Sequence, residues 1–141
     1  MNIEQFKLLK EKFESDLELN EDNVMEKSLK FSSLYSKCLN FYLQEVKILK
    51  TILIEKDKVY GELYHKFKFN PDKEPQYNYT LDSHKELDIY VKSHDDYYKK
   101  ALQYQNQELI VKYLEETLKN IDSTGYRIKN FIEFKKLGMS V

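Results

Sequence analysis

The feature that most constrains this chain is the stretch from Asp22 to Phe69, which contains no proline and a single glycine, Gly61. Its apolar residues recur at alternating steps of four and three, the heptad spacing of a helix that packs along another helix. The positions are Tyr35, Leu39, Tyr42, Val46, Leu49, Leu53, Lys56, Tyr60, Leu63 and Phe67. The stretch therefore predicts one long helix with a single polar seam position, Lys56.

A second apolar stripe lies beside this seam and comprises Cys38, Phe41, Ile48, Ile52 and Val59. A helix with so wide an apolar surface is expected to meet two neighbours, from its own chain or from another subunit. Residues 2–18 also have amphipathic helical spacing. This segment either folds back on the same subunit or serves as a mobile partner-binding arm.

Both prolines fall in residues 70–82, which predicts a loop there. Two capping patterns follow, Ser83 with Glu86 and Ser93 with Asp96, and they predict helices over 84–92 and 94–136. Gly125 lies inside the last helix at a cost of about 1 kcal/mol relative to alanine, and we interpret it as a candidate bend. The fold class predicted is all-α, with long antiparallel helices in an elongated coiled-coil-like bundle.

Composition agrees with long exposed helices, because 41% of the residues are hydrophobic, 33% are charged and only three are glycine. No apolar run approaches the roughly 20 residues of a membrane span, and the first residues do not form a signal-peptide core. We therefore expect a soluble, unexported protein with no membrane partner. Cys38 is the only cysteine, which excludes an intrachain disulfide and favours a reducing compartment.

The net charge of −1 conceals an alternating distribution along the chain. Residues 1–27 carry −4, residues 28–73 carry +4, residues 74–124 carry −4 and residues 125–141 carry +3. Such alternation allows segments or subunits to meet with complementary charge and leaves basic stripes for an anionic partner. Solvated helix faces explain the same pattern equally well.

Motifs for catalysis or cofactor binding are not recognisable. The three scattered glycines build neither a phosphate-binding loop nor a dinucleotide-binding loop, so no cofactor is predicted. His65, His84 and His94 are not at metal-ligand spacing, and acidic residues after His94 suit the start of a helix. Cys38 has apolar helical neighbours and is interpreted as a core residue. An enzyme is therefore the weakest hypothesis.

Lysine and aromatic residues are interleaved in KDKVYGELYHKFKFN, residues 56–70. Single-stranded nucleic acid is bound by cationic grooves that follow the phosphates and by aromatic faces on which bases stack, and this segment has both ingredients. Phe67 also continues the heptad seam, so a structural role for it is at least as well supported.

The closing segment GYRIKNFIEFKKLG, residues 125–138, is both aromatic and cationic. A nucleic-acid patch, a membrane-surface helix, a docking helix and a self-assembly helix would each fit it. Its apolar face is narrower than a membrane-surface helix usually has. Lysines in a last turn also complement the helix dipole. We favour a core or subunit-contact face with a solvated cationic side.

Three blocks resemble the UvsY-type recombination mediator proteins of T-even-like bacteriophages. They are SLKFSSLYSKCLNFY (28–42), the aromatic and basic segment that ends at 69, and YLEETLKNIDSTGYRIKNFIEFKKLG (113–138). The order and spacing of these blocks also fit the family, so the resemblance covers about residues 24–138. Its most specific part is an aromatic residue, then I-K-N-x-I-E, an aromatic residue and a basic pair, here Tyr126 to Lys136.

The resemblance implies a non-enzymatic protein that binds single-stranded DNA, assembles into a ring-like helical homo-oligomer and helps to load a RecA-like recombinase. The strand would already be covered by single-stranded DNA-binding protein, in the cytoplasm of the infected bacterial host. We therefore expect two parts: an N-terminal amphipathic helix or arm, residues 1–20, and a helical single-stranded DNA-binding and oligomerisation domain, residues 21–141. The rival is a structural coiled-coil adaptor with no nucleic-acid role.

Site residues follow from the resemblance together with the residues present. The family has basic residues just before an aromatic cluster, but Gly61, Glu62 and Leu63 stand at the nearest positions here. Either the basic charge has moved a few residues along the chain or DNA binding has weakened. We favour the former, so the DNA-binding residues expected are Lys58, Tyr64, His65, Lys66 and Lys68. The oligomerisation residues expected are Ile121, Tyr126, Ile128, Phe131, Ile132 and Phe134.

Overall fold

The structure, a computed structural model, describes residues 1–20, 22–69 and 84–138. Within these ranges all regular secondary structure is helical and no strand occurs, which confirms the all-α prediction. The helices are α1 (Ile3–Leu17), α2 (Val24–Phe69), α3 (His84–Ser93) and α4 (Asp95–Lys136). The predicted loop at 70–82 and the predicted cap at Ser83 lie outside the described residues.

The chain divides into two compact units that share the two long helices. Unit 1 comprises Met1–Val46 and Ile110–Val141, and unit 2 comprises Lys47–Leu109. Unit 1 thus contains α1, the first part of α2 and the second part of α4, while unit 2 contains the remaining parts and α3. The division predicted at residue 20 is a different one and stays a prediction.

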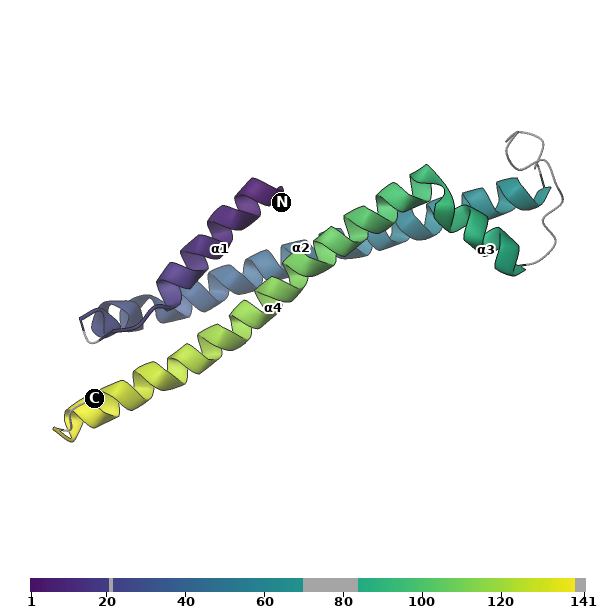
Figure 1. Cartoon of the computed structure of the whole chain (residues 1–141). Coiled ribbons are helices and arrows are strands. Elements are labelled where there is room, and N and C mark those ends of the chain that lie inside the picture. Colours follow the sequence, from purple (N-terminus) through teal and green to yellow (C-terminus); the bar gives the residue numbers. More distant parts are fainter. Residues whose placement is uncertain (21, 70–83, 139–141) are drawn as a thin grey trace. The chain divides into compact units, whose positions relative to one another are not determined.

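The core of unit 1 is built from α1, α2 and α4 around four buried side chains: Phe13, Cys38, Leu114 and Ile121. The Cys38 thiol donates a hydrogen bond to the Leu114 carbonyl oxygen, 3.9 Å away, and burial raises the pKa of that thiol to about 11. In Figure 1, α1 and the beginning of α2 run in opposite directions. The interpretation of Cys38 as a core residue is confirmed.

The two long helices run antiparallel within each unit. In unit 1, Phe31 approaches Gly125 and Cys38 approaches Leu114, so residue numbers rise along α2 as they fall along α4. The same holds in unit 2, where Lys56 approaches Tyr104 and Tyr60 approaches Tyr97. The ten predicted seam positions of α2 are all buried or half-buried.

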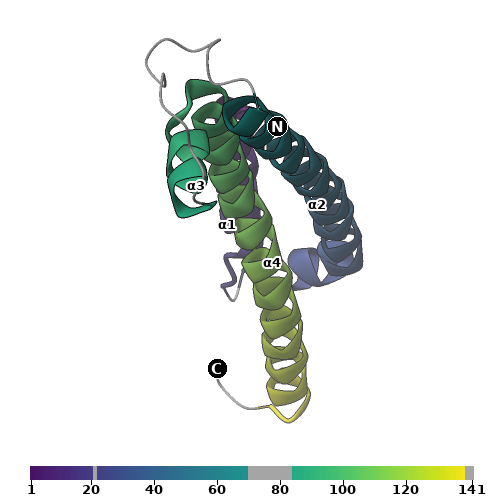
Figure 2. The same ribbon diagram turned by 90° about the vertical axis from the view of Figure 1, so that its right-hand side faces the viewer.

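The core of unit 2 is a smaller cluster in which the end of α2 packs on α3. Its buried members are Leu63, Phe67, Leu87 and Val91. Figures 1 and 2 both show the chain turning between α3 and α4. This turn sets α3 against the last turns of α2, where the aromatic and basic segment lies.

The predicted capping role of Ser93 is wrong. Ser93 is the last residue of α3, and its hydroxyl donates a hydrogen bond to the Ile89 carbonyl oxygen at 2.7 Å. His94, the residue before α4, caps the helix instead, because its Nδ1 accepts a hydrogen bond from the backbone N–H of Asp96 at 3.2 Å. The Ser93 hydroxyl thus bonds to the preceding turn of its own helix instead of capping the next helix, a common arrangement for serine side chains.

Candidate nucleic-acid interface

The last turns of α2 gather aromatic and basic side chains on one side of the helix, within unit 2. Positions 61, 64, 65 and 68 are spaced by three or four residues, which places them on neighbouring faces of a helix. They line a shallow cavity of about 350 Å³. Its lining residues are Tyr60, Gly61, Tyr64, His65, Lys68, Phe69 and His84.

Three of the five predicted DNA-binding residues, Tyr64, His65 and Lys68, line this cavity. Lys58 does not, but it is exposed and lies seven residues before His65, so both point to nearly the same side of α2. Lys66 is half-buried and is rotated by about 100° from His65. Lys66 therefore lies apart from the three predicted DNA-binding residues that line the cavity.

Tyr64 is held in place by contacts from two helices. Its ring stacks on Tyr60, with centroids 6.0 Å apart and an interplanar angle of 29°. Its hydroxyl lies 3.0 Å from Nδ1 of His84, at the start of α3. The ring is consequently pre-oriented at the edge of the cavity.

Tyr60 is anchored in turn by a carboxylate of α3. Its hydroxyl donates a hydrogen bond to Oδ1 of Asp88 at 2.5 Å. This hydrogen bond, together with burial, raises the pKa of Tyr60 to about 12. The same bond and one from Lys92 lower the pKa of Asp88. A neutral tyrosine and a charged carboxylate thus join α2 to α3 next to the candidate site.

The outer edge of the cavity is aromatic, cationic and open to solvent. Phe69 is 62% exposed, and its ring centroid lies 4.8 Å from that of His65 and 5.3 Å from Nζ of Lys68. An exposed aromatic ring beside a lysine offers a stacking face and a phosphate contact together. Phe69 and His84 were absent from the predicted site. The aromatic and basic composition around residue 69 was a usable signal for Phe69.

The six predicted oligomerisation residues fall into three groups in α4, according to their exposure to solvent. Ile121 and Ile128 are buried within unit 1, and Phe131 and Ile132 are half-buried. Tyr126 and Phe134 are 72% and 44% exposed. The exposed pair is available for a contact with another molecule, whereas the buried pair faces the interior of the unit.

In the part of the chain that the structure describes, no cluster of three or more histidine, cysteine or acidic residues is placed so that it could hold a metal ion. His94 serves there as a helix cap. Among the described helices, none is both long enough and apolar enough to span a membrane.

Comparison with known proteins finds a matching family and solved structures of similar fold. A family model described as "Recombination, repair and ssDNA binding protein UvsY" matches residues 12–139. One crystal structure of the bacteriophage T4 recombination mediator protein UvsY has a TM-score of 0.79 at 16% identity, with 94% of this chain and 98% of that chain covered. A second crystal form of the same protein gives 0.77 at 18% identity, covering 98% of each chain. A search among curated protein sequences gave no match.

Proposed function

Because the chain belongs to the UvsY family of recombination, repair and single-stranded-DNA-binding proteins, we propose that it acts as a recombination mediator on single-stranded DNA. It binds the strand as a ring-like homo-oligomer and promotes loading of a RecA-like recombinase onto DNA covered by single-stranded DNA-binding protein. The reaction takes place in the cytoplasm of the infected bacterial host. No catalytic step is required of the protein.

The observation that carries this proposal is the aromatic and cationic surface at the end of α2. Lys68 and Lys58 are exposed and supply positive charge for phosphates. Tyr64 and Phe69 supply ring faces beside them, and stacking of a base on an aromatic ring contributes about 1–3 kcal/mol without regard to sequence. A mediator needs such sequence-tolerant binding because it must act wherever a strand is exposed.

Assembly strengthens a surface that is modest in one subunit. When several copies are held together, binding of the strand to one copy raises its effective concentration at the next. The exposed Tyr126 and Phe134 on α4 are the residues that we propose to contact a second copy.

A DNA-binding measurement on single-lysine variants tests the proposal. We expect Lys68→Ala to weaken binding of a labelled single-stranded oligonucleotide roughly equally for all sequences. It should also lower the salt slope by about 0.7, the value for one lost phosphate contact on a single strand. Fluorescence anisotropy between low and moderate salt provides both quantities.

Two further variants make the test specific. Lys50→Ala, an exposed lysine of α2 outside the cavity, is the matched control and should leave the slope unchanged. Lys66→Ala should have less effect than Lys68→Ala, since Lys66 does not line the cavity. Negligible affinity of the wild-type oligomer for the oligonucleotide at low salt would leave the adaptor hypothesis in place of this one.

Recombinase loading is tested separately. A strand saturated with single-stranded DNA-binding protein is mixed with a RecA-like recombinase, and filament nucleation is timed with and without this protein. We expect a shorter lag with the wild type and a smaller effect with Lys68→Ala. A lag that the wild type does not shorten would contradict the mediator role while leaving DNA binding intact.

A further inference from the structure

Four lysines converge on a cavity in unit 1, far along the sequence from the candidate DNA-binding residues. The cavity has a volume of about 370 Å³ and is lined by α1, α2 and α4. Its charged residues are Lys12, Asp16, Glu26, Lys27, Lys30 and Lys37. Positive charge therefore exceeds negative charge at this place, in a chain whose net charge is −1.

Two of the four lysines already have acceptors. Lys30 forms an ion pair with Oε1 of Glu26 at 3.0 Å. Lys27 donates hydrogen bonds to the backbone carbonyl oxygens of Ser15, at 2.6 Å, and of Glu18. Lys27 thus joins the end of α1 to α2, whereas Lys30 is paired within α2.

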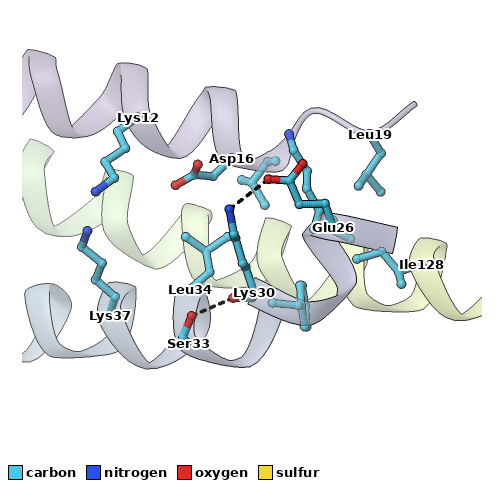
Figure 3. A pocket seen from close by; sticks show the side chains of 13 residues that line it. Lys12, Asp16, Leu19, Glu26, Lys30, Ser33, Leu34, Lys37 and Ile128 are labelled. Carbon is cyan, nitrogen blue, oxygen red and sulfur yellow. Dashed lines mark hydrogen bonds and ion pairs between the residues drawn. The ribbon is translucent and has the colours of Figure 1, made fainter. Parts of the chain in front are cut away.

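The other two lysines face each other. Lys12 on α1 and Lys37 on α2 point their ammonium groups toward one another, as Figure 3 shows. Within the described residues, neither ammonium forms an ion pair with a carboxylate. The contact with Lys12 lowers the pKa of Lys37, burial lowers it further, and Asp16 acts in the opposite direction. Lys12 and Lys37, from different helices, are both exposed to solvent and bring two like charges together beside the Asp16 carboxylate.

We propose that the Lys12–Lys37 pair, in the cavity between α1 and α2, is a binding site for a phosphate group. A lysine ammonium offers three hydrogen-bond donors on a compact charge, and the oxygens of a phosphate group can accept from two such groups at once. The anion would convert the repulsion between the two lysines into a bridge that joins α1 to α2.

A phosphate group fits this cavity better than a chloride ion does, because its several oxygens accept from both ammonium groups at once. Asp16 also lines the cavity and repels any anion, but the two lysines together outweigh this single carboxylate. The site lies outside the proposed DNA-binding surface of unit 2, so this inference goes beyond the proposed function. The phosphate group comes either from a free phosphate or from the backbone of a bound strand.

The test is thermal unfolding of the full-length chain in sodium phosphate and in sodium chloride at equal ionic strength and pH. We expect phosphate to raise the Tm of the wild type above its value in chloride. A double variant, Lys12→Gln with Lys37→Gln, should lose this increment. Each lysine contributes a charge-assisted hydrogen bond, so its removal should weaken phosphate binding about tenfold or more.

Two control variants separate a built site from general effects of charge. Lys7→Gln removes an exposed lysine of α1 that does not line the cavity, and it should keep the full phosphate increment. The charge-conserving double variant, Lys12→Arg with Lys37→Arg, should also keep most of it. In chloride at low ionic strength, Lys12→Gln should be at least as stable as the wild type, because it removes one of two like charges.

Oligonucleotide binding distinguishes the two sources of phosphate. If the group belongs to the strand, the double glutamine variant lowers the salt slope by about 1.4, equivalent to two contacts. If it is free phosphate, the slope stays unchanged while the Tm increment is lost. The proposal is overturned if phosphate stabilises the wild type no more than chloride does, or stabilises the double glutamine variant equally.

Discussion

A single close contact explains why a glycine, Gly125, stands inside helix α4. Inside a helix a glycine costs about 1 kcal/mol relative to alanine, so its place in α4 needs a compensating contact. A Cβ added there would lie 2.8 Å from Cζ of Phe31, closer than real contacts allow. Because Gly125 has no side chain, the Phe31 ring of α2 can pack directly against the backbone of α4. The sequence suggested a bend at Gly125, and this packing reason was not predicted.

Replacement of the two helical glycines should have opposite effects. Gly61→Ala meets open space and should raise the free energy of unfolding by about 0.5–1 kcal/mol. Gly125→Ala must displace Phe31, and since overpacking costs about 1–3 kcal/mol, it should be less stable than the wild type. Urea unfolding measures both. Equal stabilisation by the two alanines would show that the Phe31 ring moves aside without cost.

Tyr60 gives the stability of unit 2 a dependence on alkaline pH. Its pKa in the folded state is about 12, above the ordinary value of 10.0, because its hydroxyl donates to Asp88. The folded state therefore holds this proton more tightly than the unfolded state, and the contribution is complete below pH 10 and is lost as pH rises toward 12. Tyr60→Phe should flatten the decline in that window. If thermal unfolding of the variant at pH 10–11 declines as steeply as that of the wild type, the bond to Asp88 is not the cause.

At the scale of elements, the helices were predictable and their contacts were not. The predicted ranges 2–18, 22–69, 84–92 and 94–136 correspond to α1, α2, α3 and α4 within two residues at each end. Apolar periodicity and the rarity of glycine and proline are properties of each segment alone, so they are legible in the sequence. The cap at His94 was missed because a histidine nitrogen seldom takes the place of a serine or aspartate at a helix start.

Contacts between helices depend on their relative register, which heptad spacing leaves open. For this reason the sequence did not show that His84 reaches Tyr64 or that Lys12 meets Lys37. The burial of Glu45 was also not predicted from the sequence. This residue is 4% exposed in unit 1, and its Oε1 lies 3.9 Å from the α-ammonium of Met1. Glu45 stands seven residues from both Cys38 and Ile52, so the stripe that contains them continues through it. A search for apolar residues alone passes over such a position.

Phe13 is the buried side chain of helix α1 and belongs to the same core cluster as Cys38, Leu114 and Ile121 in unit 1. Phe13→Ala should lower the free energy of unfolding of unit 1 by about 3–5 kcal/mol, the usual cost of removing a buried phenyl ring. Ile3→Ala, on the same helix but 72% exposed, is the matched control and should be nearly neutral.

Amide hydrogen exchange can show which helices lose stability in the Phe13→Ala variant. We expect Phe13→Ala to accelerate exchange in α1 and in the part of α4 after residue 110, with little change at the amides of α3. Uniform acceleration through both units would mean that they unfold as one cooperative body.

At the scale of the whole molecule, the proposed oligomer can be tested at exposed residues that do not contribute to the core of a single subunit. Tyr126→Asp and Phe134→Asp place a charge on exposed side chains of α4, so they should lower the mass of the assembly while leaving each subunit folded. Light scattering measures the mass and circular dichroism the helix content. Ile128→Asp is the contrast, because that side chain is buried within unit 1 and its replacement should reduce helix content as well. Wild-type mass in both exposed-site variants would remove α4 from the proposed interface.

The division of the chain into units has a consequence for its biosynthesis. Contacts of unit 2 join residues near in sequence, such as Tyr64 with His84, 20 residues apart, and Glu55 with Lys100, 45 apart. Contacts of unit 1 join Cys38 to Leu114 across 76 residues and Lys10 to Tyr113 across 103. On the ribosome, unit 2 has all its residues once Leu109 has emerged, whereas the first 46 residues must wait for the final segment. Phe13 and Cys38 thus stay without their α4 partners until translation is almost finished, so the nascent amino-terminal segment keeps these apolar side chains unpacked during most of its synthesis.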